Sequence, residues 1–183
     1  MSEARAATLE DLKRLLTALH AEKAEYLLIG GYALIAHGDP RATVDIGLLV
    51  PARCDAAEPL RRALLVLPDR AASKIAPEWF EEGKGIRVAD EIVVDLVFRT
   101  CGENYQSLRP FEETIDLDGI PLRTVNLEGL PRTKQSARPI DAADRAVIER
   151  ALAEFRRGRS GLGNRNWGLT PRPSLHCGRQ FRT

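Results

Sequence analysis

The sequence predicts an α/β fold of the α+β kind: a small mixed β-sheet packed by helices, followed by a C-terminal helix and a flexible tail. Apolar runs at residues 26–29, 44–50 and 92–98 have the length and composition of strands. Apolar residues recur at helical spacing in residues 9–19 and 147–155. With 183 residues and 44% hydrophobic content, the chain is long enough to bury one core without disulfide or metal support.

The first half of the chain is expected to alternate helices and strands. Thr8 is expected to cap the first helix, with Asp11 three residues later in the capping-box position. After the strand at residues 26–29, a short helix is expected at residues 32–36, before Gly38. A later helix is expected at residues 59–66, since Pro59 suits a first helical turn.

The second half is expected to contain two hairpins and a long helix. Residues 86–88 and 92–98 form the first predicted hairpin, and Asp118-Gly119 is a strong signal for a tight turn in the second. The last helix is expected to run from residue 139 to about residue 157. Between the halves, Trp79-Phe80 is interpreted as core packing rather than as a base-stacking platform.

The charge distribution separates a body from a tail. Residues 156–183 contain seven Arg and no acid, which leaves 20 basic and 26 acidic residues elsewhere, a net charge of −6. An acidic body argues against a general nucleic-acid binder. We therefore expect one domain at residues 1–157 and an Arg-rich, disordered tail at residues 158–183. The tail could also engage nucleic-acid phosphates, and a solvated terminus is the simpler interpretation.

The composition also predicts a cytoplasmic protein. No apolar segment has the length of a signal peptide or a membrane span, so no membrane association is expected. The three cysteines are scattered without metal-ligand spacing, which is typical of reduced thiols.

One motif predicts a phosphate-handling site. Gly30-Gly31 directly follows a strand, where glycines let the backbone approach a phosphate closely. In the strand at residues 44–50, Val44, Ile46 and Leu48 are expected to face the core, leaving Asp45 and Gly47 on the opposite face. Carboxylates two residues apart could converge on metal ions that bridge phosphates, but Gly47 offers no ligand.

The segment from Gly30-Gly31 to Asp45-Ile46-Gly47-Leu48 resembles the nucleotidyltransferase superfamily of polymerase-beta-like enzymes. It is similar in particular to small bacterial proteins such as the toxin–antitoxin and abortive-infection nucleotidyltransferases. The resemblance implies a further acid on a later strand, for which Asp95 is the candidate. It implies Mg²⁺ or Mn²⁺ held by Asp45 and Asp95, and an NTP held by Gly30, Gly31, Arg41, Thr43 and Lys134.

Each assignment has a structural alternative. Asp45 could instead cap a turn or pair with Arg41, and Asp95 could form a structural salt bridge instead of acting as a metal ligand or general base. Gly30 and Gly31 also suit any tight strand–helix turn. Two acids follow Lys134 in the sequence, Asp141 and Asp144. They are expected to stabilise the start of the last helix.

The predicted function is transfer of a nucleoside monophosphate from an NTP to a protein or RNA hydroxyl. Gly47 places that activity in question, because loss of one of three carboxylates weakens Mg²⁺ binding. The alternative is a catalytically inactive nucleotidyltransferase-fold protein that binds a cognate protein partner in a toxin–antitoxin-like system.

Overall fold

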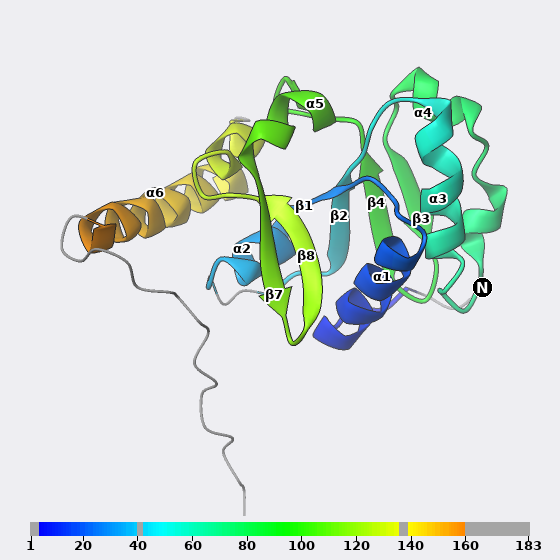
Figure 1. Ribbon diagram of the computed structural model, residues 1–183, viewed down its shortest axis with the longest axis horizontal. Coiled ribbons are helices and arrows are strands. Elements are labelled where there is room, and N and C mark those ends of the chain that lie inside the picture. The colour runs from blue at the N-terminus through cyan, green and yellow to red at the C-terminus, as the bar shows by residue number, and fades with distance from the viewer. Residues whose placement is uncertain (1–3, 40–41, 136–138, 160–183) are drawn as a thin grey trace, which may run out of the picture.

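The structure is a computed structural model that describes residues 4–39, 42–135 and 139–159. Its strands are β1 (Leu27–Ile29), β2 (Asp45–Leu49), β3 (Ile86–Ala89), β4 (Val93–Val97), β5 (Arg99–Thr100), β6 (Glu103–Asn104), β7 (Glu112–Leu117) and β8 (Ile120–Val125). Six of them form one mixed sheet in the order β3-β4-β2-β1-β8-β7, and β5 pairs with β6 (Figure 1). The predicted α/β class with a mixed sheet is confirmed.

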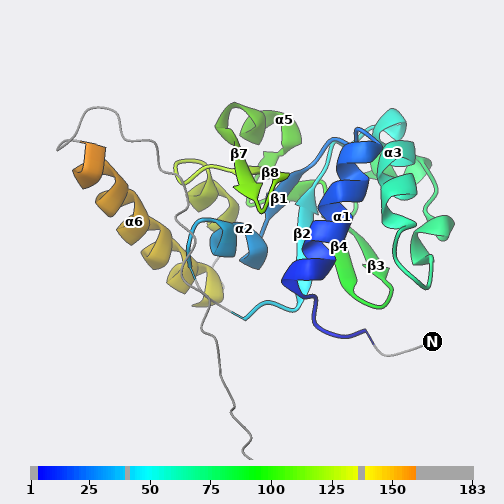
Figure 2. The ribbon, with the colours of Figure 1, turned by 60° about the horizontal axis from the view of Figure 1, so that its bottom comes forward.

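The helices flank this sheet. They are α1 (Leu9–Ala21), α2 (Gly31–Ala36), α3 (Cys54–Leu64), α4 (Glu78–Glu82), α5 (Tyr105–Leu108) and α6 (Pro139–Arg159), with 3₁₀ turns η1 (Ala71–Lys74), η2 (Arg109–Phe111) and η3 (Leu130–Lys134). Figure 2 shows α1 lying across the sheet with α3 at its side, while α6 projects away from the rest of the molecule. The predicted tail lies outside the described residues from residue 160 onward.

The start of α1 follows the predicted capping box. Thr8 accepts a hydrogen bond from the backbone N–H of Asp11, and the Asp11 carboxylate accepts one from the Thr8 N–H at 2.8 Å. Arg5 donates to both Asp11 oxygens at 2.6 and 2.9 Å and also to Glu91. Because Glu91 lies in the β3–β4 turn, this cluster ties the N-terminal segment to the sheet edge.

The register of the sheet places one row of residues side by side. β1 is antiparallel to β2, β2 is parallel to β4, and β4 is antiparallel to β3. The cross-strand partners in this row are Ile29, Gly47, Asp95 and Arg87, in that order. Cross-strand partners have their side chains on the same face, so this row defines one line of side chains across four strands.

The two faces of the central strands differ in burial. Ile46, Leu48, Val94 and Leu96 are fully buried, and each fully buried side chain of this size contributes about 1.5–3 kcal/mol to stability. The opposite face carries the two acids, which stay partly accessible. The prediction for Val44 was wrong: it is 65% exposed, because β2 begins only at Asp45.

The expected start of the helix near Pro59 is corrected by packing. Helix α3 begins at Cys54 rather than at Pro59, so the proline lies inside the helix. Ala56, Ala57 and Leu60 are buried along α3, and this tertiary contact outweighs the backbone hydrogen bond that Pro59 cannot donate.

The aromatic pair in α4 divides between core and surface. Phe80 is fully buried and packs edge-to-face on Phe98 at 5.1 Å, so core packing is confirmed for Phe80. Trp79 is 41% exposed, so the same prediction was wrong for Trp79. A helix directs consecutive side chains about 100° apart, so adjacent residues seldom share one face.

The tight turn at Asp118-Gly119 is confirmed between β7 and β8, with both residues at positive φ. Within the described part of the chain, no helix combines the length and apolar character needed to cross a membrane.

Candidate active site

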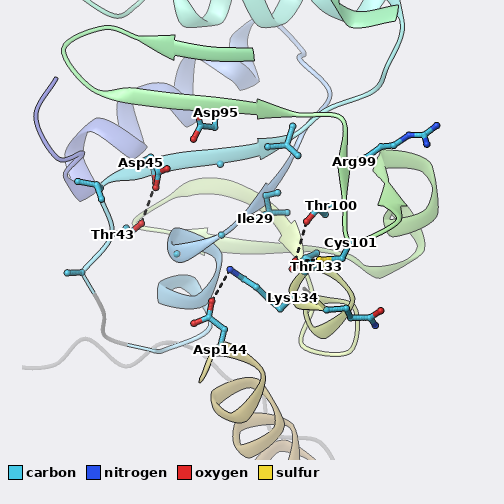
Figure 3. Close-up of a pocket in the computed structure, with 17 residues that line it drawn as sticks. Ile29, Thr43, Asp45, Asp95, Arg99, Thr100, Cys101, Thr133, Lys134 and Asp144 are labelled. Atoms are coloured by element: carbon cyan, nitrogen blue, oxygen red, sulfur yellow. Dashed lines mark hydrogen bonds and ion pairs between the residues drawn. The ribbon is translucent and has the colours of Figure 1, made fainter. Parts of the chain in front are cut away.

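The parallel pairing of β2 with β4 brings Asp45 and Asp95 to one pocket. Its volume is about 940 Å³, and its walls come from the sheet, the β1–α2 turn, the β5–β6 hairpin, η3 and the start of α6 (Figure 3). Asp95 is the cross-strand partner of Gly47, and Asp45 lies two residues earlier on the same face of β2. The two predicted acids are therefore neighbours on one wall.

The environment of Asp95 disfavours its charged form. Burial raises the pKa of its carboxyl, and the adjacent carboxyl of Asp45 raises it further, while the Arg87 guanidinium acts in the opposite direction. Arg87 Nη1 lies 3.3 Å from Asp95 Oδ2. The structure is thus compatible with both roles considered for Asp95. Its carboxylate faces the pocket, as a metal ligand or base would, and it also forms an ion pair with Arg87.

Gly47 lies next to both acids, two residues after Asp45 on β2 and opposite Asp95 on β4. An acid at this position would be the third carboxylate of the group. A Cβ atom at this position would lie 3.4 Å from the Ile29 carbonyl oxygen and 3.5 Å from Ile29 Cγ1, which are ordinary contact distances. The backbone of Gly47 is not in the left-handed region. Neither space nor backbone conformation therefore requires glycine here.

The Gly30-Gly31 turn does require glycine at both positions. Gly30 has φ +77°, a conformation that L side chains rarely adopt. At Gly31 an added Cβ would lie 2.4 Å from Thr43 Oγ1, because the Thr43 side chain packs directly against the Gly31 backbone. The turn and Thr43 form one continuous edge of the pocket, next to Asp45.

The opposite wall contains a buried ion pair. Lys134 Nζ lies 2.8 Å from Asp144 Oδ2, with side-chain exposures of 13% and 3%. Asp144 is the sixth residue of α6, beyond the first turn, where negative charge favours a helix N-terminus most. That Asp141 and Asp144 stabilise the helix start stays a prediction, and the Asp141 side chain lies outside the described residues. Asp144 holds Lys134 against the pocket and anchors α6 there.

The β5–β6 hairpin completes that wall. Thr100 Oγ1 donates to the Thr133 carbonyl at 3.2 Å, and the Cys101 thiol donates to the same oxygen at 3.4 Å. Cys101 has φ +49° and Gly102 has φ +84°, as a two-residue hairpin turn requires. The hairpin and η3 therefore form a connected support for Lys134.

The structure brings most of the predicted site together. The predicted residues that line the pocket are Gly30, Gly31, Thr43, Asp45, Asp95 and Lys134. Arg41 lies outside the described residues, so neither its phosphate contact nor its pairing with Asp45 is described.

Sequence reasoning assigned no site role to six other polar or charged residues that line the pocket: Arg99, Thr100, Cys101, Thr133, Gln135 and Asp144. Cys101-Gly102 could have indicated a hairpin, since X-Gly between short strands is a turn signal. In Figure 3 the Arg99 side chain points away from the two acids. Among the described lining residues, Lys134 is therefore the cation that faces the pocket.

Comparison with known proteins adds little to this geometry. No family model and no curated protein sequence matches the chain. Among solved structures, a candidate nucleotidyltransferase from Thermotoga maritima aligns with 83% of this chain and 92% of its own, at 14% identity and a TM-score of 0.49. A likeness at this level bears on no residue of the site.

Proposed function

We propose that the protein is a nucleotidyltransferase that moves a nucleoside monophosphate from an NTP to a hydroxyl of RNA or protein. The observation that supports this best is the shared pocket wall of Asp45 and Asp95, next to the Gly30-Gly31 turn. Neighbouring carboxylates recruit cations, and a glycine turn lets phosphates approach the backbone. The pocket volume of about 940 Å³ is within the range of ligand sites.

The donor set fits a divalent metal ion. Carboxylate oxygens are the ligands that Mg²⁺ and Mn²⁺ prefer, and Asp45 and Asp95 lie on the same face of neighbouring strands, where one cation could contact both. Asp45 and Asp95 would hold this ion. When bound, it would neutralise the triphosphate and favour attack at the α-phosphorus.

The protein's own groups would orient the reactants. The Gly30-Gly31 turn and Thr43 would hold the phosphates, with Lys134 on the far wall. The acceptor oxygen forms a bond to the α-phosphorus, and the bond to the pyrophosphate oxygen breaks as pyrophosphate leaves. Asp95 would accept the proton of the acceptor hydroxyl, for which a raised carboxyl pKa is suitable.

A second candidate is a catalytically inactive member of the same superfamily that binds a cognate protein, as in a toxin–antitoxin-like pair. Gly47 favours it, because glycine offers no carboxylate at the position two residues after Asp45. The Lys134–Asp144 ion pair also favours it, since the lysine already has a carboxylate partner.

Label transfer from each α-labelled NTP, with Mg²⁺ or Mn²⁺, tests the proposal. Native protein should label total RNA or a host protein, and Asp45→Asn and Asp95→Asn should each remove the label. Asp55→Asn is the matched control, because Asp55 is 70% exposed and does not line the pocket. Transfer that persists without Asp45 would overturn the mechanism. If no acceptor becomes labelled and a stable stoichiometric complex is isolated from the host, the second candidate would be favoured.

A further inference from the structure

A second, smaller pocket lies at the β3 edge of the sheet. Its volume is about 320 Å³, near the lower end for ligand sites. Its lining residues are Trp79, Glu82, Lys84, Gly85, Ile86 and Arg87. The Trp79 pocket, as we call it, has no part in the proposed function.

The pocket combines an aromatic surface with two cationic side chains. Trp79 is 41% exposed although its neighbour Phe80 is fully buried, so α4 presents one aromatic ring to the core and one to the pocket. Lys84 and Arg87 are its two cations, and each forms an exposed ion pair: Lys84 Nζ lies 3.2 Å from Glu82 Oε2, and Arg87 pairs with Asp95. Exposed ion pairs are weak, so a phosphate can compete with these carboxylates. Both cationic side chains are mostly exposed, at 83% and 62%, so a ligand can reach them.

This combination suits a nucleotide unit. Bases stack on exposed aromatic rings whatever their identity, and lysine and arginine contact the phosphates that join them. The pocket is too small for a folded element and is open at a sheet edge, where a single strand can enter. A double helix would not present a free base face to Trp79.

Arg87 connects this pocket to the candidate active site. It lines the Trp79 pocket, it is the cross-strand partner of Asp95, and its Nη1 lies 3.3 Å from Asp95 Oδ2. The ion pair is partly exposed and of ordinary length, so its contribution is small. A phosphate in the Trp79 pocket can therefore compete with Asp95 for the guanidinium.

We propose that the Trp79 pocket binds one nucleotide unit of a single-stranded RNA, with the base on Trp79 and a phosphate on Lys84 and Arg87. The bound strand is the acceptor, and its arrival draws Arg87 away from Asp95, which frees that carboxylate at the moment the acceptor enters. The role as acceptor rests on the proposed function. Binding of the strand does not, and it is measured without NTP.

Trp79 provides its own reporter. The chain has two tryptophans, and Trp167→Phe leaves Trp79 as the only indole. A short oligoadenylate RNA should quench this fluorescence to saturation, and the affinity should fall as salt rises. The same titration is repeated with three other ligands: single-stranded DNA of the same sequence, a duplex RNA and a short acidic peptide.

Variants are measured with end-labelled RNA by anisotropy, so that no tryptophan is needed. Trp79→Leu should weaken binding about ten-fold or more, and Trp79→Phe should retain most of it, since a ring remains for stacking. Lys84→Gln and Arg87→Gln should each weaken binding several-fold and reduce the salt slope by about one. Lys74→Gln is the matched control, because Lys74 is exposed and does not line the pocket.

The outcomes separate this inference from the proposed function. Equal binding of RNA and single-stranded DNA would support the base-and-phosphate site and assign the choice of acceptor elsewhere. Unchanged RNA affinity in a folded Trp79→Leu variant would overturn the proposal, as would stronger binding of the duplex or the peptide. If Asp45→Asn loses transfer but still binds RNA, the result would support the proposed chemistry and show that strand binding does not depend on it.

Discussion

Restoring an acid at Gly47 is the sharpest test of the candidate metal site. In Gly47→Asp the new Cβ fits at ordinary contact distance from Ile29, so the backbone need not move. The new carboxylate would stand about 5–6 Å from that of Asp95, given the usual strand spacing of about 4.8 Å. At an effective dielectric constant of about 20, such a pair repels by about 3 kcal/mol. Solvent in the open pocket reduces this to about 1–2 kcal/mol.

The backbone opposes part of that loss. Replacing glycine at a position that tolerates a side chain stabilises a protein by about 0.4–1 kcal/mol, through the unfolded state. Without metal, Gly47→Asp should therefore be less stable than Gly47→Asn by about 1–2 kcal/mol, or a few degrees in Tm. Gly47→Asn is the control, since it has the same shape without the charge.

Metal should reverse the order. A cation at one hundred times its Kd stabilises the folded state by about 2.7 kcal/mol. Thermal unfolding of native, Gly47→Asp and Gly47→Asn proteins, with Mn²⁺ or with chelator, measures this directly. Mn²⁺ should raise the Tm of Gly47→Asp the most and that of Gly47→Asn no more than the native protein. An equal response of the Asp and Asn variants would refute the idea that position 47 faces a metal site.

Three further predictions concern stability and pH. Phe80→Ala should lower the free energy of unfolding by about 3–5 kcal/mol in urea titrations, because it empties a fully buried site. Gly31→Ala should cost about 1–3 kcal/mol, with relief from the second change Thr43→Gly, because the added methyl meets the Thr43 side chain. The hydrogen bonds of Arg5 hold the pKa of Asp11 well below its usual range, so its stabilising effect is present above the unfolded-state pKa of about 3.9 and is lost as pH falls below that value. Asp11→Asn should flatten this part of the urea-stability profile.

Each of these has an outcome that would contradict it. A loss below about 1 kcal/mol in Phe80→Ala would mean that the core collapses around the missing ring. Equal stability of Gly31→Ala with and without the Thr43 change would locate the strain elsewhere. An unchanged acid slope in Asp11→Asn would assign the pH dependence to other carboxylates.

The position of the two acids could be predicted from local pattern. Strand periodicity gave the face of Asp45, and an isolated acid in an apolar run marked Asp95. Their adjacency depends on β2 pairing with β4, which joins segments far apart in the chain. The motif resemblance, which implies one metal ion held by both acids, predicted that they lie close together, and periodicity by itself could not.

The side-chain partners within the site were not predicted. Arg87 and Asp95 face each other across the predicted hairpin, but the pattern of apolar residues did not fix the register that pairs them. The pairing of Lys134 with Asp144 depends on how α6 packs against η3. The start of α3 was predicted wrongly because it also depends on packing. Pro59 is a good first-turn residue, but burial of Ala56 and Ala57 extends the helix toward its N-terminus, to Cys54.

The Lys134–Asp144 pair also has a consequence for synthesis on the ribosome. β1 is synthesised early, but it pairs, through Leu28 and Thr124, with β8, which is synthesised much later. The pocket wall is complete only when Asp144 has been synthesised and pairs with Lys134. A nascent chain that ends before Asp144 carries both acids and the glycine turn without this wall. The complete pocket should therefore form only after residue 144 has emerged from the ribosome.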